Sequence, residues 1–152
     1  MELHRLSQEK YAGSLSGKGA ALKGARWNSV GFELVYTAAN RSLAMAEIAV
    51  RLTLATIPND YVMVTLFAPD DIGMFQLAPK DLPSDWNSWP HSVSTQAIGD
   101  RFIIENKYPI LKVPSAVTQG DFNLLINPFH VDFHRIKIVQ QEAFPFDRRI
   151  FK

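Results

Sequence analysis

The segment Tyr61–Ala68 places the strongest constraint on the fold of this chain. Its sequence, Y-V-M-V-T-L-F-A, is apolar at nearly every position, so both faces of a strand formed there would be apolar. A strand with one face in water alternates between apolar and polar residues, whereas a strand covered on both sides does not. The sequence therefore predicts a central strand at Tyr61–Ala68 that the rest of the chain covers on both faces.

The order of the other segments predicts the fold class. The remaining predicted strands are Met1–Leu6, Phe32–Ala38, Met74–Leu77, Tyr108–Val113, Phe122–Asn127 and Arg135–Val139, with a last edge segment in the Phe/Pro-rich tail. The predicted helices are Ser42–Thr56, capped by Asn40 and stopped by Pro58, and a second one capped by Ser94 or Thr95 that runs through Asn106. This order is not a regular β-α-β alternation, so we expect one α+β domain over residues 1–152.

Composition excludes several classes of function. The chain has 16 Lys+Arg against 15 Asp+Glu, a formal charge of +1 and no cysteine. No global field is available to attract nucleic acid or an anionic membrane, so any anion must be bound by a local cluster. Disulfides, thiolate catalysis and cysteine-based zinc sites are also excluded. The N-terminus is too polar for a signal peptide, and no apolar run approaches the roughly 18 residues of a membrane span, so we expect a cytoplasmic protein.

Three local patterns carry weak chemical signals. Gly13–Gly24 is rich in glycine but lacks the P-loop pattern, and its G-x-S-x-G element follows no strand, so it predicts a mobile loop. His130 and His134 lie beside a predicted strand instead of on a helix, and we interpret them as surface or packing residues, with no metal site. Leu82–Pro90 carries two tryptophans that cap a core or line a pocket, and capping is favoured for at least one of them.

A carboxylate lies inside the apolar stripe of the first predicted helix. Leu43, Glu47, Val50 and Leu54 share one face at spacings of four, three and four residues. A partly buried carboxylate at that place can act on a ligand. The alternative is an exposed ion pair between Glu47 and Arg51, worth only a few tenths of a kcal/mol.

Glu47 follows two other groups that suit a polyanionic ligand with an aromatic ring. Arg26 offers a rigid fork for pyrophosphate, although it could also lie on the surface and stack on Trp27. Tyr36 can stack on a heteroaromatic ring or serve as a core aromatic at a strand end. Cleavage of the nicotinamide–ribose bond of NAD needs such a set, because the ribose becomes oxocarbenium-like. Nicotinamide leaves as a neutral molecule, so one carboxylate can suffice.

Several motifs in order along the chain resemble one family. They are G-A-R-W-N-S-V-G, V-Y-T-A, S-L-A-M-A-E, L-P-S-D-W, T-Q-A-I-G-D, V-P-S-A and N-L-L-I-N-P-F-H. Together they are similar to the RES domain, a family named after its arginine, glutamate and serine. The resemblance implies a mixed, largely antiparallel, split sheet like that of ADP-ribosyltransferases. This chain departs from the pattern at Ala25, where a second glycine is expected before the arginine.

The resemblance also implies roles for five residues. The family arginine and tyrosine fall on Arg26 and Tyr36, the glutamate on Glu47 and the serine on Ser115, while Arg5 matches a further N-terminal arginine. Arg5 and Arg26 are expected to hold the pyrophosphate or orient the glutamate, and Tyr36 to stack against nicotinamide. Ser115 is expected to bond the nicotinamide ribose or carboxamide, and Glu47 to stabilise the oxocarbenium.

RES proteins are toxins of bacterial toxin–antitoxin pairs, partnered by an Xre-type helix-turn-helix antitoxin. We therefore expect a type II toxin that degrades NAD⁺ as its substrate by hydrolysis or phosphorolysis, with no permanently bound cofactor. An ADP-ribosyltransferase with a protein target is the alternative, and a non-catalytic binding module is a second one. We expect no direct contact with nucleic acid or membrane, and the sequence leaves a homodimer open.

Overall fold

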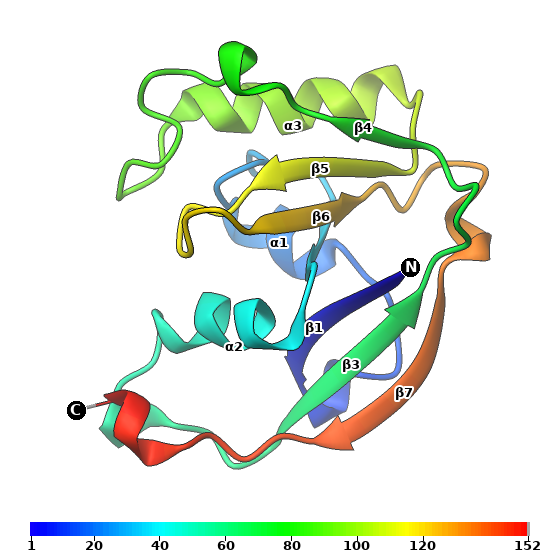
Figure 1. The fold of residues 1–152 in the computed structure, drawn as a ribbon. Helices are drawn as coiled ribbons and strands as arrows, with labels where there is room; N and C mark the ends of the chain where they lie inside the picture. The colour runs from blue at the N-terminus through cyan, green and yellow to red at the C-terminus, as the bar shows by residue number, and fades with distance from the viewer. Residues whose placement is uncertain (152) are drawn as a thin grey trace.

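The computed structural model describes residues 1–151, except for the side chain of Leu54. The seven strands in these residues form one sheet (Figure 1). The strands are β1 Glu2–Gln8, β2 Val35–Ala38, β3 Tyr61–Phe67, β4 Met74–Gln76, β5 Ile110–Pro114, β6 Phe122–Ile126 and β7 Lys137–Ala143. Their order in the sheet is β4-β5-β6-β2-β1-β3-β7. All neighbouring pairs are antiparallel except β4 and β5, which are parallel. The α+β class with a mixed, largely antiparallel sheet is confirmed.

The sheet is divided into two sections between β1 and β2. All residues of β1 pair with β3, from Glu2 opposite Phe67 to Gln8 opposite Tyr61. Within the described residues, β1 pairs with β2 only at His4 and Ala38. The sections β4-β5-β6-β2 and β1-β3-β7 therefore diverge from this joint, as Figure 1 shows, and the split sheet expected from the resemblance is confirmed.

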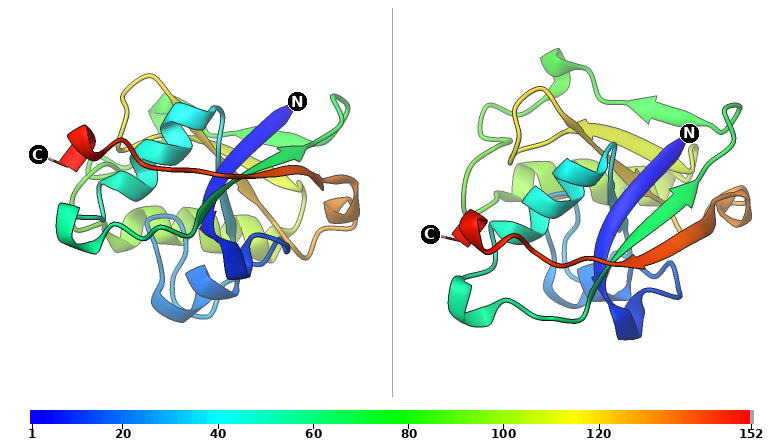
Figure 2. Two further views of the ribbon diagram at one scale, coloured as in Figure 1. Left: turned by 90° about the horizontal axis from the view of Figure 1, so that it is seen from below. Right: turned by 60° about the horizontal axis from the view of Figure 1, so that its bottom comes forward.

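Three α-helices pack around the two sections. They are α1 Lys18–Lys23, α2 Arg41–Ala49 and α3 Val93–Glu105, with short 3₁₀ turns η1 Glu9–Tyr11, η2 Leu54–Thr56, η3 Pro79–Asp81, η4 Phe133–Arg135 and η5 Arg148–Phe151. Helix α2 contacts β1 and β2. Helix α3 lies along β4 and β5 (Figure 1), and the C-terminal turn η5 lies beside α2 (Figure 2). No helix in the described part of the chain is long and apolar enough to cross a membrane.

The buried apolar residues form three clusters. Under α3 lie Trp27, Leu34, Leu77, Phe102, Leu111, Val113 and Leu125. Leu43 and Ala44 of α2 pack with Leu6, Ala38 and Met63 of the sheet. The largest part joins β1, β3, β6 and the loop before α1 through residues such as Leu3, Ala12, Val64 and Ile126. Met63 to Leu66 are all buried, which confirms β3 as an interior strand covered on both faces.

The prediction that Gly13–Gly24 is a mobile loop is wrong for its second half, which forms α1. Tertiary hydrogen bonds hold this short helix: the Asn28 Nδ2 donates to the Ala20 carbonyl at 3.0 Å. The Gly31 amide donates to the Ala21 carbonyl at 2.8 Å. Gly24 ends the helix with a positive φ of 72°, a conformation that suits glycine. Because these partners come from the following loop, the local sequence gave no signal for the helix.

Helix α2 begins as predicted but ends early. The Asn40 side chain accepts from the Leu43 amide at 2.8 Å, which confirms the cap. The predicted end at Thr56 is wrong, because the helix stops at Ala49 and Thr53 starts η2 with a reciprocal capping box to Thr56. Val50 is 64% exposed, so it does not continue the apolar stripe. Leu54, the last predicted member of that stripe, has a side chain outside the described residues.

Other boundaries were also predicted wrongly. Strand β2 begins at Val35 instead of Phe32. Helix α3 is capped by Ser92, whose hydroxyl accepts from the Ser94 amide at 3.3 Å, and Ser94 and Thr95 lie inside the helix. Strand β7 covers Lys137–Ala143 instead of Arg135–Val139, because it follows β3 across a bulge and continues through polar residues at the exposed edge of the sheet. The tail that was predicted as an edge segment ends in η5.

Candidate functional site

Glu47 lies on α2, in the last turn of the helix, and its carboxylate is half-buried. Its Oε1 accepts a hydrogen bond from the Ser115 hydroxyl at 3.0 Å. In the described part of the chain, Oε2 has no hydrogen-bond partner and Glu47 forms no ion pair within 4.0 Å, so the predicted alternative of a Glu47–Arg51 pair is wrong. One carboxylate oxygen is held and the other is free.

Ser115 orients that carboxylate. It follows the end of β5, and it is only 3% exposed. Its hydroxyl oxygen accepts from the amides of Val117 at 3.1 Å and Thr118 at 3.0 Å. A hydroxyl has one hydrogen and two acceptor lone pairs, so these two amides leave its hydrogen for Glu47. The turn after β5 therefore fixes the direction in which Ser115 donates.

The Arg26 guanidinium is anchored at one nitrogen. Its Nη1 donates to the carbonyl oxygens of Trp86 at 2.8 Å and Ser88 at 2.9 Å. In the described residues Nε and Nη2 have no hydrogen-bond partner, so this edge of the fork is free for a ligand. Burial lowers the pKa of Arg26, while the nearby negative charge of Glu47 opposes that shift. The structure thus brings Arg26 and Glu47 within electrostatic reach of each other.

The hydroxyl group of Tyr36 bonds to the two residues that follow Arg26. It donates to Asn28 Oδ1 at 2.7 Å and accepts from the Trp27 amide at 3.0 Å. The half-buried ring packs against the core under α3. Burial raises the pKa of the Tyr36 hydroxyl well above its usual value, so the group stays protonated. Tyr36 therefore has a structural role through both its hydroxyl group and its ring.

Arg5 lies next to the joint of the two sheet sections, one residue after His4. Its Nη1 is buried and, among the described residues, has no hydrogen-bond partner. Burial lowers the pKa of Arg5, and no nearby carboxylate offsets the shift. A buried cationic donor without a partner is costly, which makes it a candidate for binding an anion.

Sequence reasoning missed three residues around this site. Asn28 is fully buried, and its side chain joins α1, the Arg26 loop and Tyr36 through four hydrogen bonds. Burial, followed by the charges of Arg26 and Arg51, lowers the pKa of His91, which places both arginines near that ring. The only signal for Asn28 was its place directly after Arg26 and Trp27. Arg51 was considered only as an ion-pair partner of Glu47, and His91 carried no signal.

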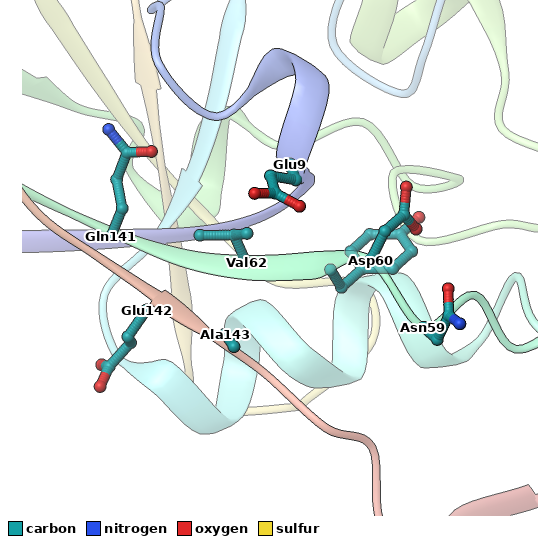
Figure 3. A pocket seen from close by; sticks show the side chains of 8 residues that line it. Glu9, Asn59, Asp60, Val62, Gln141, Glu142 and Ala143 are labelled. Atoms are coloured by element: carbon teal, nitrogen blue, oxygen red, sulfur yellow. The ribbon is translucent and has the colours of Figure 1, made fainter.

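Other predicted candidates lie elsewhere. Trp86 packs against the core under α3, as expected for one of the two tryptophans, whereas Trp89 is 80% exposed. His130 bonds to the Lys107 carbonyl and the Asp132 amide, and His134 bonds to the Val131 carbonyl. The described residues contain no cluster of three side chains that could hold a metal. Figure 3 shows a surface hollow formed by residues next to and within β3 and β7, lined in part by Glu9, Asp60 and Glu142. Its carboxylates are unsuited to a pyrophosphate.

The fold and the site define an α+β protein with a split sheet and a carboxylate–arginine centre between its parts. The sequence profile of the RES domain matches residues 2–147. The Prs ADP-ribosylating toxin of a Sphingobium species is 34% identical over 93% of this chain and 89% of its own length. A Toxin Res of Photorhabdus laumondii is 35% identical over 100% of this chain and 98% of its own.

The fold is shared with a chain of a solved toxin–antitoxin complex. In the crystal structure of the MbcT–MbcA toxin–antitoxin complex of M. tuberculosis, the matching chain is 21% identical, with a TM-score of 0.76 over 94% of this chain and 83% of that one. The chain therefore belongs to the RES domain toxin family. The family expected from the sequence motifs is confirmed.

Proposed function

We propose that this protein consumes NAD⁺ by breaking the bond between nicotinamide and ribose, and that it is the toxin of a toxin–antitoxin pair. The observation that carries the proposal is the hydrogen bond from Ser115 to Glu47 at 3.0 Å, which orients a half-buried carboxylate near Arg26. The name of the similar Prs ADP-ribosylating toxin supports the use of NAD. Water and phosphate are both acceptors that fit this chemistry.

Glu47 supplies the charge that the reaction needs. When the bond from ribose C1′ to nicotinamide nitrogen breaks, both electrons leave with nicotinamide, which becomes neutral, and positive charge develops on the ribose. A carboxylate fixed before the reaction stabilises that charge without reorganising during it. Ser115 holds Oε1, so Oε2 is the oxygen that faces the ribose. An oxygen of water or phosphate then bonds to C1′, and an acceptor water releases one proton to the solvent.

The role of Ser115 in this proposal differs from that implied by the resemblance. Its one hydrogen is directed to Glu47, and its oxygen accepts from two amides. We therefore assign Ser115 as the residue that positions Glu47, instead of a ligand of the nicotinamide ribose or carboxamide.

The arginines and Tyr36 bind the rest of the substrate in this proposal. The free Nε and Nη2 edge of Arg26 suits two oxygens of a pyrophosphate. Arg5 offers a buried donor without a partner in the described chain, and an anion would satisfy it. The half-buried ring of Tyr36 stacks on nicotinamide, while its hydroxyl keeps the ring in place.

Nicotinamide release tests the proposal directly. Purified, antitoxin-free protein is incubated with NAD⁺, with and without phosphate, and the products are separated by chromatography. We expect free nicotinamide, together with ADP-ribose in the hydrolytic case or its phosphorylated form in the phosphorolytic case. Intact NAD⁺ in both reactions would show that the protein does not carry out this chemistry.

A second candidate function is the transfer of ADP-ribose to a protein, which the name of the Sphingobium relative supports. Labelled NAD⁺ added to a cell lysate separates the two: a transferase labels a protein band, whereas a hydrolase or phosphorylase releases label as a small molecule. The partner proposed for either activity is a cognate antitoxin, because the solved fold neighbour was crystallised in a toxin–antitoxin complex. An Xre-type antitoxin and a cytoplasmic location stay predictions, and a homodimer stays open.

A further inference from the structure

We propose that Thr95, on the buried face of α3, is a positioning residue for Arg26. This inference rests on the proposed function, in which Arg26 binds substrate. Thr95 is 0% exposed, and its hydroxyl donates to the Arg26 carbonyl oxygen at 2.6 Å. Its contact with the Ser92 carbonyl is longer, at 3.3 Å, so the single hydroxyl hydrogen serves Arg26. Thr95 thus holds the backbone of Arg26 without contacting the free edge of the guanidinium.

Three more residues of the same helix face hold the segment around Arg26. Gln96 donates to the Ala25 carbonyl at 3.1 Å. Asp100 accepts from the Ser29 amide at 2.9 Å and also from the Ser29 hydroxyl. Gly99 lies between Gln96 and Asp100. Because it has no side chain, the backbone of α3 contacts the backbone of the segment around Arg26. The spacing of these residues along α3 gives one continuous face.

Gly99 shows how close this contact is. A Cβ atom built at Gly99 would lie 1.5 Å from the Trp27 carbonyl oxygen. No side chain fits at that distance, so the segment Ala25–Ser29 lies directly on the helix backbone. The contact excludes water, which strengthens the hydrogen bonds made beside it and makes the loss of one costly.

Both ends of Arg26 are therefore fixed by one continuous stretch of chain. The backbone carbonyl is held by Thr95, and the Nη1 atom by the carbonyls of Trp86 and Ser88, in the loop that leads to α3. A shift of α3 relative to this loop would turn the guanidinium fork. Because a displacement of about 1 Å at a positioning group can cost about 100-fold in rate, we infer that Thr95 controls how well Arg26 meets its ligand.

The test compares two substitutions at Thr95. Thr95→Val keeps the shape and removes the hydroxyl, and we expect kcat/KM for NAD⁺ to fall about 10- to 100-fold, with most of the change in KM. Thr95→Ser keeps the hydroxyl and should restore most of the activity. A Thr95→Val protein with wild-type kcat/KM, or a Thr95→Ser protein as impaired as Thr95→Val, would overturn the proposal.

A double-mutant cycle separates positioning from general structural damage. If Thr95 acts through the fork of Arg26, adding Thr95→Val to Arg26→Lys should cause little further loss of kcat/KM, because the fork is already gone. If the losses in kcat/KM of the two single variants multiply in the double variant, Thr95 acts elsewhere and the proposal is overturned. Gln96→Met is a milder second variant, for which we expect a loss of about three- to tenfold.

Amide hydrogen exchange gives a readout that does not depend on activity. Thr95→Val should speed exchange at the amides of Trp27 and Ser29, which bond to Tyr36 and Asp100 in the folded protein, and Thr95→Ser should not. Unchanged exchange in Thr95→Val would overturn the positioning role. If the wild type releases no nicotinamide but Thr95→Val still speeds exchange, Thr95 would hold the Arg26 segment as proposed. The proposed function would then be refuted instead.

Discussion

Ser115 uses all its hydrogen-bonding capacity, and the direction of those bonds decides how Glu47 can react. The carboxylate is held by a neutral donor and lacks an ion pair within the described residues. A carboxylate paired tightly with an arginine would have its charge neutralised before the reaction. Here the negative charge stays available for the ribose, while its direction is fixed.

We expect Glu47→Gln to keep the fold and to lose about 10²- to 10³-fold in kcat for nicotinamide release, as for the loss of one preorganised electrostatic group. The amide oxygen can still accept from Ser115, and a neutral amide is cheaper to bury than a carboxylate, so the melting temperature should hold or rise. Single-turnover kinetics and thermal unfolding measure the two effects. A variant with full activity and a much lower melting temperature would make Glu47 a structural residue.

Arg26→Lys tests whether the fork or only the charge matters. A lysine keeps the positive charge but cannot reach the carbonyls of Trp86 and Ser88 while also offering two parallel donors to a pyrophosphate. We expect kcat/KM for NAD⁺ to fall at least about tenfold, which corresponds to the loss of one charge-assisted hydrogen bond. Steady-state kinetics decide the matter, and near-wild-type turnover would remove Arg26 from the site.

At the scale of elements, α3 holds part of the site although it lies far from Arg26 in the sequence. No residue of α3 was predicted to bear on the chemistry, yet its face from Thr95 to Asp100 holds the segment that bears Arg26. Helix α2 has the complementary task of presenting Glu47. Each of the two elements therefore holds one of the two charged groups.

Gly99→Ala should destabilise the protein by more than about 1–3 kcal/mol, because its Cβ would collide with the Trp27 carbonyl and force α3 away from the Arg26 segment. Gly19→Ala in α1 is the matched control, since a Cβ there meets nothing within 4 Å. Alanine is a better helix former than glycine, so this control should be neutral or stabilising by up to about 1 kcal/mol. Denaturant unfolding measures both changes, and equal stabilities would contradict the close contact.

At the scale of the whole molecule, the pH dependence of stability reports on the packing around Tyr36. Burial raises the pKa of Tyr36 and, to a smaller degree, that of Tyr61. A raised folded pKa gives stability that is complete below the unfolded value of about 10 and is lost as the pH rises toward the folded value. The free energy of unfolding should therefore fall above about pH 10, by up to about 1.4 kcal/mol per pH unit for one such group.

Tyr36→Phe should lower the stability at neutral pH, because it removes two hydrogen bonds, and should flatten the fall above about pH 10. Tyr61→Phe is the control and should flatten the fall less. Denaturant unfolding from pH 8 to 11 provides the measurement. An unchanged slope in Tyr36→Phe would mean that the hydroxyl is not buried in solution.

The sequence by itself determined those features that depend on neighbouring residues. Periodicity and turn residues located most of the strands, and the side chain of Asn40 marked the start of α2. The motifs identified the family and, with it, the split sheet. The residue types of Arg26, Tyr36 and Glu47 suggested the chemistry, and the resemblance of the motifs to the RES domain assigned their roles.

Only the tertiary structure decided which groups meet. Helix α1 depends on hydrogen bonds from the loop that follows it, such as those of Asn28, and these compete with the local pattern. The hydrogen bond from Ser115 to Glu47 joins residues 68 positions apart, and that from Thr95 to Arg26 joins residues 69 apart. Contacts at such separations form only when the chain folds, so no local pattern in the sequence encodes them.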